Sequence, residues 1–542
     1  MLLAAGPAHA QADYVLREAR IYTASDEQPE AGALAVRDGR ILMVGSESEV
    51  LDAYPDAPRK SAGGRAVVPG LIDAHAHLMG QGRSVMQADL VGTSSREDVV
   101  ERLKAFAEER DLPDGAWLRG RGWDQNDWPD TDFPTRQALD EAFPERPVWL
   151  ERIDGHAGWA NTAALEAVGL DALRRMSDPE GGSIVRTGDG TPTGVFVDAA
   201  TEIVASEIPP PTPNQERQAL QLALETTARH GLTGVHDAGV DMATIRRYRE
   251  AIDAGRFPLR VYAMIGGRGR AFDHFCDEGP LRGERLSVRS VKFYIDGALG
   301  SRGAALLDDY SDDPGNRGLL LQSPEEFQQN VRRGLQCGFQ VNTHAIGDRG
   351  NRVVLDAYEQ AVPNAGRTVG RHRIEHAQIL SPQDLPRFAE LDVIASMQPT
   401  HATSDMPWAG DRLGKERLRG AYAWQSLLDS GARLAFGSDF PVEDVDPLKG
   451  FYAAVTRQNA EGEPEGGWLS DERVSRRAAL HGFTIDAAYA AFMEDEVGSL
   501  EPGKRADFVV LTKDIMQVPT HEILEAEVAA TFLDGEAVYG EL

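Results

Sequence analysis

The stretch Val-Val-Pro-Gly-Leu-Ile-Asp-Ala-His-Ala-His-Leu, residues 67–78, decides the fold of this chain. Here an apolar run ends in His75 and His77, two positions apart. On a β-strand, side chains at positions i and i+2 point to the same face, so both imidazoles can reach one metal ion from the end of one strand. The pair alone is a weak signal. Its weight comes from further candidate ligands that each follow an apolar strand of their own.

More apolar runs follow, mostly separated by amphipathic stretches, and this alternation is typical of a parallel βα barrel. The eight predicted strands are 66–74, 232–238, 259–265, 289–296, 339–344, 371–377, 392–399 and 433–439. Both chain ends show short alternating runs with Asp-Gly turns at 38–39 and 534–535, which predicts one small β-sandwich built from both termini. The predicted fold class is therefore α/β, a (β/α)8 TIM-like barrel with a terminal β-sandwich.

About 150 residues separate the first two predicted strands, far more than a normal βα connection needs. We therefore predict a composite sandwich from 11–66 and 495–542, a barrel from 67–80 and 228–494, and an inserted substrate-capping domain at 81–227. The insert carries five of the chain's eight tryptophans: Trp117, Trp123, Trp128, Trp149 and Trp159. Either they pack the insert's own core, or some of them, with Trp123 the candidate, contact substrate.

The composition is that of an ordinary globular protein with a strong acidic excess. With 56 basic and 86 acidic side chains, the net charge of −30 argues against nucleic acid and anionic membranes as partners. No stretch is long and apolar enough to span a membrane. The two cysteines, Cys276 and Cys337, offer neither a disulfide framework nor a Cys-rich zinc site, and we expect them to pack as small apolar residues.

The first twelve residues are similar to the tail of a signal peptide. Ala8-His9-Ala10 fits the small-x-small cleavage pattern, although a positively charged start is absent. We expect a periplasmic or secreted protein, with a cytoplasmic location as the alternative.

Lys292 lies inside the apolar run Val291–Asp296, where an ammonium group needs a partner. One interpretation is a lysine paired with a buried carboxylate. The other is a lysine of lowered pKa that has captured carbon dioxide, giving a carbamate whose oxygens bridge two metal ions. The residues alone leave both interpretations open.

Three more predicted strands end in candidate ligands, His344, His376 and Asp439. In βα barrels the carboxyl ends of the strands form the active-site face. Imidazole and carboxylate ligands suit zinc and similar divalent ions, which lower the pKa of bound water. Because Asp439 can take the proton of that water, the pattern predicts metal-dependent hydrolysis.

These segments resemble the amidohydrolase superfamily, in the branch of YtcJ-like hydrolases and N-substituted formamide deformylases. The resemblance covers nearly the whole chain. The matching segments are PGLIDAHAHL (69–78), DGHAGWANTAAL (154–165), VKFYIDGALGSRGA (291–304), NTHAIGD (342–348), RIEHAQ (373–378), GSDFPV (437–442) and GSLEPGKRADFVVL (498–511).

The resemblance implies six metal ligands, His75, His77, Lys292, His344, His376 and Asp439. The first two would hold one ion, His344 and His376 a second, and Lys292 would bridge them as N6-carboxylysine. Asp439 would bind the first ion and shuttle a proton. The implied cofactor is one or two zinc ions, with manganese or iron(II) as alternatives.

For several of the remaining candidates, a purely structural role is the alternative to a functional one. His156 of the insert, like His376, would steady the oxyanion as a catalytic group, or else has a local structural role. The candidates for substrate contact are Trp123, His236, Asp296, Arg302 and Gln398, with His401 close to the last. For His236 the alternative is a hydrogen bond to a ligand, and for Arg302 an ion pair with a neighbouring aspartate. Glu375 precedes a ligand on the opposite strand face, so we expect it to pair outside the barrel.

The predicted function is hydrolysis of a non-peptide carbon–nitrogen bond, in a small amide or formamide with an apolar substituent, by metal-activated hydroxide. An esterase, lactonase or cyclic-amide hydrolase on the same scaffold is the alternative. A metal-binding barrel without turnover is a more remote one, because a pure binder needs no proton shuttle such as Asp439. The sequence is compatible with a homodimer without deciding it.

Overall fold

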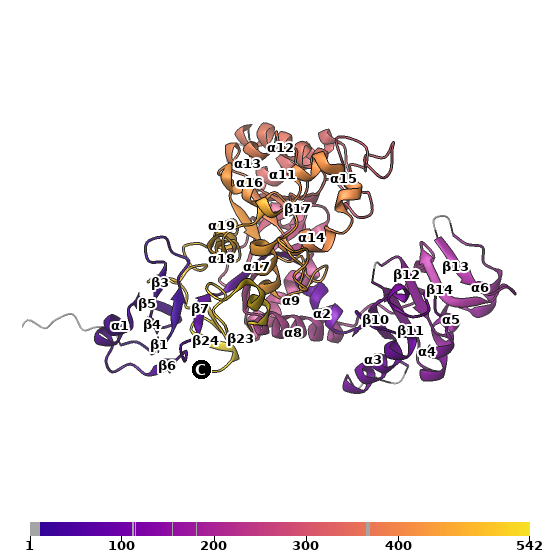
Figure 1. Cartoon of the computed structure of the whole chain (residues 1–542), viewed down its shortest axis with the longest axis horizontal. Helices are drawn as coiled ribbons and strands as arrows, with labels where there is room; N and C mark the ends of the chain where they lie inside the picture. Colours follow the sequence, from indigo (N-terminus) through magenta and orange to yellow (C-terminus); the bar gives the residue numbers. More distant parts are fainter. Residues whose placement is uncertain (1–10, 111–112, 114, 154, 180–181, 365–368) are drawn as a thin grey trace, which may run out of the picture. The chain divides into compact units, whose positions relative to one another are not determined.

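A computed structural model describes residues 11–542 apart from 111–112, 114, 154, 180–181 and 365–368 (Figure 1). The chain divides into two compact units, Met1–Gly80 with Ala223–Leu542, and Gln81–Leu222. The leader containing Ala8-His9-Ala10 falls outside the described residues, as does Asp154 of the insert motif. Within the described ranges, no helix combines the length and apolarity that a membrane crossing requires.

The centre of the first unit is a barrel of eight parallel strands, as predicted. Between the last strand and the first, backbone hydrogen bonds of 2.8 Å run from the Asp439 N–H to the His75 carbonyl and from the His77 N–H to the Phe440 carbonyl. The barrel strands are β8 (Leu71–Ala76), β15 (Leu232–Val240), β16 (Arg260–Gly266), β17 (Leu286–Tyr294), β18 (Gln340–Ala345), β19 (Arg373–His376), β20 (Ile394–Met397) and β21 (Leu434–Phe436).

The first predicted strand, 66–74, is two strands in the structure. β7 (Ala66–Pro69) belongs to the sandwich and β8 to the barrel, and the chain passes from one to the other at Gly70. A Cβ atom on Gly70 would lie 2.1 Å from Thr233 Oγ1 on β15, so a glycine is required for this close approach. His75 of β8 and the following His77 thereby continue a segment that belongs to both sheets.

Helices follow the barrel strands along the chain. In α11, Pro324 occupies the first turn and the Ser323 side chain accepts a hydrogen bond from the Glu326 N–H, which caps the helix start. The helices are α2 (Leu78–Val85), α8 (Pro213–Arg229), α9 (Met242–Asp253), α10 (Arg270–Glu278), α11 (Pro324–Gln336), α12 (Asp348–Ala361), α13 (Leu385–Glu390), α14 (Pro399–Asp405), α15 (Ala409–Arg417), α16 (Trp424–Asp429), α17 (Pro447–Thr456), α18 (Arg476–Gly482) and α19 (Ile485–Ala490).

Both chain ends form the predicted β-sandwich. One sheet has the order β5 (Arg40–Gly45), β4 (Ala33–Arg37), β1 (Tyr14–Arg17), β6 (Arg59–Ser61), and α1 (Glu47–Ala53) follows β5 in the chain. The other has the order β24 (Glu536–Gly540), β23 (Val528–Leu533), β22 (Phe508–Leu511), β7, β2 (Arg20–Tyr22), β3 (Glu30–Ala31). The two sheets share a buried core that includes Leu34, Val67 and Phe532. Both predicted Asp-Gly turns have positive φ at each residue, which suits tight hairpins.

The inserted unit contains a mixed sheet of its own with the order β13 (Gly182–Arg186), β14 (Pro192–Asp198), β12 (Ala157–Ala160), β11 (Val148–Arg152), β10 (Leu118–Trp123), β9 (Ala88–Asp89). Its helices are α3 (Arg96–Glu109), α4 (Gln137–Ala142), α5 (Thr162–Val168), α6 (Leu170–Arg175) and α7 (Glu202–Ala205). Trp123, Trp128 and Trp159 pack together in its core, and the Trp123 N–H donates to the Leu150 carbonyl at 3.0 Å. Trp123 is fully buried there, as the alternative of core packing expects, and its contact with substrate stays a prediction.

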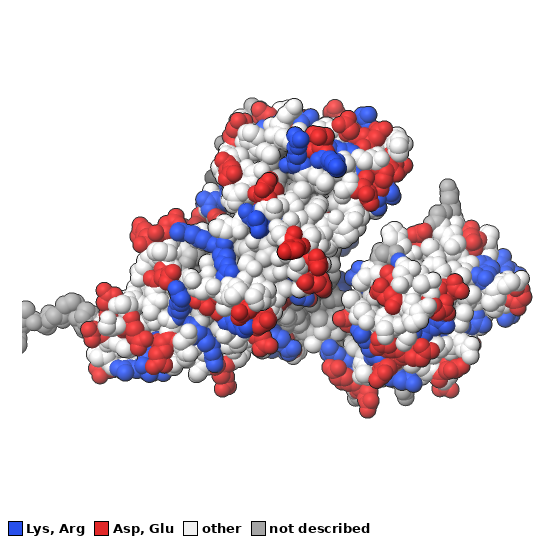
Figure 2. All heavy atoms as spheres, viewed as in Figure 1, with Lys and Arg blue, Asp and Glu red and all other residues white. Residues whose placement is uncertain are grey.

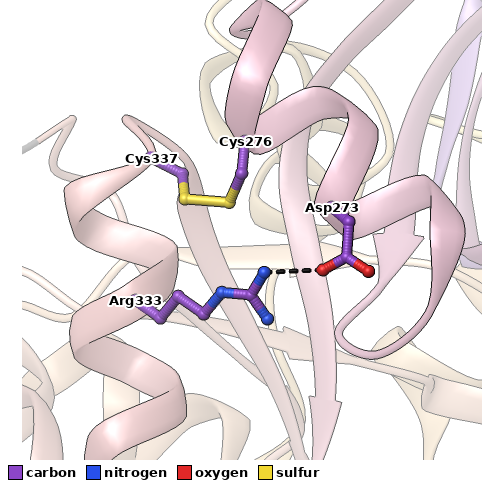
Figure 3. Close-up of a disulfide and its surroundings, with 4 residues drawn as sticks. All are labelled: Asp273, Cys276, Arg333 and Cys337. Atoms are coloured by element: carbon purple, nitrogen blue, oxygen red, sulfur yellow. Dashed lines mark hydrogen bonds and ion pairs between the residues drawn. A yellow bond between two sulfur atoms is a disulfide. The ribbon is translucent and has the colours of Figure 1, made fainter.

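The expectation for the cysteines was wrong, because Cys276 and Cys337 form a disulfide (Figure 3). Cys276 lies in α10, and Cys337 caps the end of α11. The two helices follow the adjacent parallel strands β16 and β17, so residues 61 positions apart in sequence come together. Beside the disulfide, Arg333 Nη2 of α11 lies 2.6 Å from Asp273 Oδ1 of α10, a second link between the helices.

We predict that this disulfide contributes about 2–4 kcal/mol to the free energy of unfolding, because it closes a long loop in the unfolded chain. Reduction of the protein, or the double substitution Cys276→Ser/Cys337→Ser, should lower the thermal midpoint measured by circular dichroism. The double variant is the control, since reductant should not change its midpoint further. Equal midpoints for the oxidised and reduced protein would show that the bond contributes no stability.

Candidate metal centre

Four imidazoles surround the carboxylate of Asp439 at the carboxyl end of the barrel. Oδ1 of Asp439 lies 3.2 Å from His77 Nε2 and 3.7 Å from His75 Nε2. Oδ2 lies 3.7 Å from Nε2 of His401, in α14. Two sets of three potential ligand atoms, His75–His77–Asp439 and His376–His401–Asp439, each fall within 4.8 Å of one another and share this one carboxylate.

The other two predicted ligands lie beside this cluster. Lys292 Nζ, near the end of β17, is 3.1 Å from His75 Nε2. The ring centroids of His344 and His376 are 4.6 Å apart, and those of His75 and His376 are 4.8 Å apart. The six side chains singled out in the sequence therefore lie together, and His401, expected only near substrate, lies with them.

Three of the imidazoles are held through hydrogen bonds at Nδ1. His75 Nδ1 lies 2.5 Å from Glu375 Oε2, and His77 Nδ1 lies 3.0 Å from the Ala238 carbonyl oxygen. His376 Nδ1 lies 2.8 Å from Gln398 Oε1. Bonding at Nδ1 to an acceptor fixes the tautomer and leaves Nε2 with its lone pair for a metal ion, the arrangement common around metal-bound histidines. Gln398 thus orients a candidate ligand, a role that the sequence did not indicate.

Unpartnered buried atoms in the cluster fit a metal ion. Nε2 of His344 and Nε2 of His401 are buried and have no hydrogen-bond partner among the residues that the structure describes. A buried polar atom without a partner costs about 1–3 kcal/mol, a cost that coordination would offset. Imidazole nitrogen and carboxylate oxygen are also a donor set that suits zinc and its neighbours.

The charge states of His75, His344 and Asp439 are those that coordination requires. At His77 burial alone would lower the pKa, but the hydrogen bond with Asp439 raises it above its ordinary value. Burial, together with the nearby Lys292, lowers the pKa of His75 to about 4 and that of His344 to about 3, so both imidazoles are neutral near pH 7. Burial alone would raise the pKa of Asp439, but the surrounding imidazoles, that of His77 foremost, lower it to about 2. Neutral imidazoles and an ionised carboxylate are the metal-binding forms.

Lys292 is buried, and burial lowers the pKa of its amine to about 8. Its Nζ contacts His75 and lies 4.8 Å from the ring centroid of Tyr294. Within the part of the chain that the structure describes, no carboxylate forms an ion pair with it. The interpretation as a lysine paired with a buried carboxylate is therefore not what the structure shows.

Glu375 lies inside the barrel, so the expectation that it pairs outside was wrong. Strict alternation would send Glu375 and His376 to opposite faces, but φ at His376 is +74° and the strand ends there. Glu375 is fully buried between His75 and Arg373, whose Nε lies 2.8 Å from Glu375 Oε1. Although burial opposes ionisation, Arg373 and His75 hold the pKa of Glu375 well below its usual range.

His236 also belongs to this buried series of contacts. Its Nδ1 accepts a hydrogen bond of 2.9 Å from Arg373 Nη1, so His236 supports the cluster through Arg373 and Glu375. Burial lowers the pKa of His236 well below its usual value, which keeps the ring neutral.

Two candidates for substrate contact are engaged within the protein. Asp296 is buried and accepts backbone N–H bonds from Ala305, Ile346 and Gly347 at 2.8–3.0 Å, which ties together the segments that follow β17 and β18. Arg302 forms an ion pair of 2.8 Å with Asp312, the alternative considered for it.

His156, in the inserted unit, has its Nδ1 2.8 Å from Asp198 Oδ1 and is exposed. Its catalytic role stays a prediction.

One residue that supports the cluster, Asp73, was not predicted from the sequence. The Asp73 carboxylate accepts hydrogen bonds from the Ser438 hydroxyl at 2.6 Å and from the Ser438 N–H at 3.0 Å, which holds the segment after β21 against β8. A Cβ atom on Gly437 would lie 2.5 Å from Asp73 Oδ1, so this close approach also requires glycine. The Asp at 73 and the Gly-Ser before Asp439 were the available clues.

Comparison with known proteins agrees with this geometry. The amidohydrolase family profile matches residues 61–539, and a bacterial imidazolonepropionase-like composite domain matches 32–57. The putative amidohydrolase YtcJ of Bacillus subtilis is 34% identical, with 96% of this chain and 98% of that protein covered. The N-substituted formamide deformylase of Arthrobacter pascens is 31% identical, with coverages of 97% and 98%. An uncharacterized metal-dependent hydrolase from Pyrococcus horikoshii superposes with a TM-score of 0.76 at 28% identity, covering 94% and 99% of the two chains.

We predict that Glu375→Gln weakens zinc binding by about 10–100-fold, because the neutral amide no longer fixes the His75 ring as the carboxylate does. Affinity would be measured by competition with a chromophoric chelator. Glu494→Gln is the matched control, because Glu494 also pairs with an arginine, Arg371, but lies away from the cluster. Unchanged zinc affinity in a Glu375→Gln variant that folds, as judged by its melting curve, would contradict the role given to Glu375.

Proposed function

The chain belongs to the amidohydrolase family, and from this premise we propose that it hydrolyses the carbon–nitrogen bond of small non-peptide amides, with N-substituted formamides as the substrate class. The observation that carries the proposal is the single carboxylate of Asp439 shared by two sets of imidazoles. The relative from Arthrobacter pascens, which is named for deformylation of N-substituted formamides, supports the substrate class, because the similarity extends over 97% of this chain.

We propose that His75, His77 and Asp439 hold one zinc ion, and that His376 with His344 or His401 holds a second. When bound, such an ion lowers the pKa of a water molecule and polarises the substrate carbonyl. Manganese and iron(II) favour similar nitrogen and oxygen donors and are the alternatives to zinc.

Asp439 moves the proton in the proposed reaction. Its carboxylate accepts a proton from the attacking water as the new bond from oxygen to the carbonyl carbon forms. The bond from carbon to nitrogen then breaks, and Asp439 returns the proton to the leaving nitrogen. The products are an amine and formic acid, or another carboxylic acid for other amides. The interactions of both carboxylate oxygens with imidazoles keep Asp439 in place for both transfers.

We also propose that Lys292 carries a carbamate that bridges the two ions. Its neutral amine would attack carbon dioxide, forming a nitrogen–carbon bond and releasing one proton. The lowered pKa of Lys292 and the missing carboxylate partner within the described residues both favour this reaction.

For the carbamate, we expect the intact zinc-loaded protein to carry the added mass of one carbon dioxide under native conditions. Lys292→Arg, which keeps the charge but cannot form a stable carbamate, should lack that mass and should bind fewer zinc ions per chain. Native mass spectrometry measures both quantities. An unmodified Lys292 in protein that is loaded with two zinc ions would contradict the bridging role.

Two exposed side chains near the cluster, Tyr294 and Val442, form an apolar wall that supports an apolar substituent on the substrate. Tyr294, at the end of β17, is 40% exposed, and its ring centroid lies 5.5 Å from that of His344. Val442, three residues after Asp439, is 63% exposed. Apolar surface next to candidate ligands suits an aromatic or branched N-substituent better than a charged one.

We propose a periplasmic or secreted location, which the disulfide supports. Disulfides persist in oxidising compartments and are rare in the cytosol. The reduction experiment on Cys276 and Cys337 tests the structural bond on which this proposal rests.

For the reaction, we expect the zinc-loaded protein to hydrolyse N-benzylformamide with a higher kcat/KM than N-methylformamide, because only the larger substituent reaches the apolar wall. Amine release would be measured across formamides, acetamides, lactams, lactones and esters. Preference for esters or lactones would identify the esterase alternative. Absence of turnover across the whole panel, in protein shown to contain metal, would contradict the proposal.

Asp439→Asn should lower kcat/KM by about 100-fold or more, because the amide cannot accept a proton. Asp392→Asn is the matched control. Asp392 also has a left-handed backbone conformation, with φ of +51° against +65° at Asp439, but it is exposed and precedes β20 at its amino end. The control should keep full activity. Retained activity in Asp439→Asn would remove the proton shuttle from the mechanism.

A further inference from the structure

An arginine-lined pocket lies at the opposite end of the barrel from the candidate metal centre. Its volume is about 420 Å³, and its lining includes Arg40, Arg260, Arg282, Arg289 and Arg505. Arg260 is the first residue of β16, and Arg289 precedes Lys292 on β17, so the pocket lies toward the starts of the strands. None of the side chains grouped around Asp439 lines it.

Three of these arginines are neutralised by acidic side chains. The ion pairs are Arg40–Glu496 at 2.8 Å, Arg260–Asp507 at 2.7 Å and Arg505–Glu284 at 2.6 Å. Arg282 and Arg289 differ, because neither forms a hydrogen bond or an ion pair with any residue in the described ranges. The pocket therefore holds two guanidinium groups outside any ion pair in the described ranges, the exposed one of Arg282 and the partly buried one of Arg289, although Glu284 and Glu496 also line it.

Arg289 is the more constrained of the two. It is partly buried, and its Cζ lies 4.2 Å from the centroid of the Phe492 ring. Cζ of Arg371 lies 4.8 Å from the same ring. Burial, and then the positive charges of Arg282 and Arg371, lower the pKa of Arg289, although Tyr262 and Glu494 act in the opposite direction. An anion beside Arg289 would relieve both the desolvation and the repulsion.

The pocket also has an apolar side. Ala491, Phe492, Met493 and Val497 line it together with the arginines. Phe492 has φ of +59°, a left-handed conformation that bulky residues rarely adopt. This backbone turn places the Phe492 ring beside the Arg289 guanidinium, so the site offers an apolar surface next to a positive charge.

We propose that this pocket binds a small organic anion, a carboxylate or phosphate monoester attached to an apolar body. Arg289 and Arg282 would hold the anionic group, because the planar guanidinium matches carboxylate and phosphate oxygens. The body would lie against Phe492 and Met493. A volume of about 420 Å³ is within the usual range for small-molecule sites.

The acidic net charge of the chain disfavours non-specific binding of anions. The chain carries a net charge of −30, and on the face shown in Figure 2 basic side chains lie among acidic ones. A diffuse attraction of anions is therefore not expected, and binding depends on the local pair of guanidinium groups that form no ion pair within the described residues.

The test uses zinc-loaded protein and probes that separate this pocket from the metal centre. Crystals would be soaked with 4-iodobenzoate or 4-iodophenyl phosphate, and the iodine located by anomalous diffraction. Titration calorimetry would measure affinity for benzoate, phenyl phosphate and the neutral benzyl alcohol. We expect an iodine peak beside Arg289 and Phe492 with at least one probe, whichever anion is preferred, and no binding of benzyl alcohol there.

Arg289→Gln should weaken binding at this site by about tenfold or more, as expected for the loss of a charge-assisted hydrogen bond. Arg332→Gln is the matched control, because Arg332 is an exposed arginine of α11 and does not line the pocket. If Arg289→Gln does not fold, Arg282→Gln should weaken binding in the same direction. Iodine only at the metal centre, iodine nowhere, or unchanged affinity in a folded arginine variant would each overturn the proposal. None of these readouts depends on the hydrolytic reaction.

Discussion

The structure depends on one buried carboxylate, that of Asp439, being held among imidazoles. Without those imidazoles, burial would favour the protonated acid. The barrel makes the arrangement possible, because its last strand closes on its first. The hydrogen bond from the Asp439 N–H to the His75 carbonyl fixes the register of that closure, and the contacts of Asp73 with Ser438 reinforce it. Residues from opposite ends of the barrel sequence therefore meet at one point.

A connected series of buried polar groups inside the barrel supports the cluster. His75 contacts Glu375, Glu375 pairs with Arg373, and Arg373 donates to His236. Loss of one partner from such a buried pair costs about 3–5 kcal/mol, since the remaining charge stays without water. This series of buried groups therefore fixes the orientation of a candidate ligand. A single substitution within it would lower the stability of the fold, which fits a site whose geometry must be kept.

Much of this arrangement could be predicted from the sequence. The eight apolar runs indicated the barrel, and the two Asp-Gly turns indicated the sandwich hairpins, because both patterns reflect local periodicity and turn chemistry. The side chains predicted as metal ligands, His75, His77, Lys292, His344, His376 and Asp439, lie close together in the structure, since the ends of parallel strands meet on one face, and their coordination of metal stays a prediction. The failures came where the backbone departs from regular geometry or where contacts are long-range. The positive φ at His376 interrupts the alternation of side chains along the strand. The prediction that Glu375 points out of the barrel was wrong for that reason. The disulfide depends on the adjacency of α10 and α11, which the sequence does not show.

The same barrel thus presents different chemistry at its two ends, imidazoles and a carboxylate at one and a pocket rich in arginine at the other. Anomalous diffraction at the zinc absorption edge, from zinc-loaded crystals, is the most direct test of the proposed metal centre around Asp439. The account predicts a zinc peak at about 2.0–2.2 Å from Nε2 of His75, Nε2 of His77 and a carboxylate oxygen of Asp439. Zinc-loaded crystals with no peak at these three side chains, or with zinc bound only elsewhere, would contradict it.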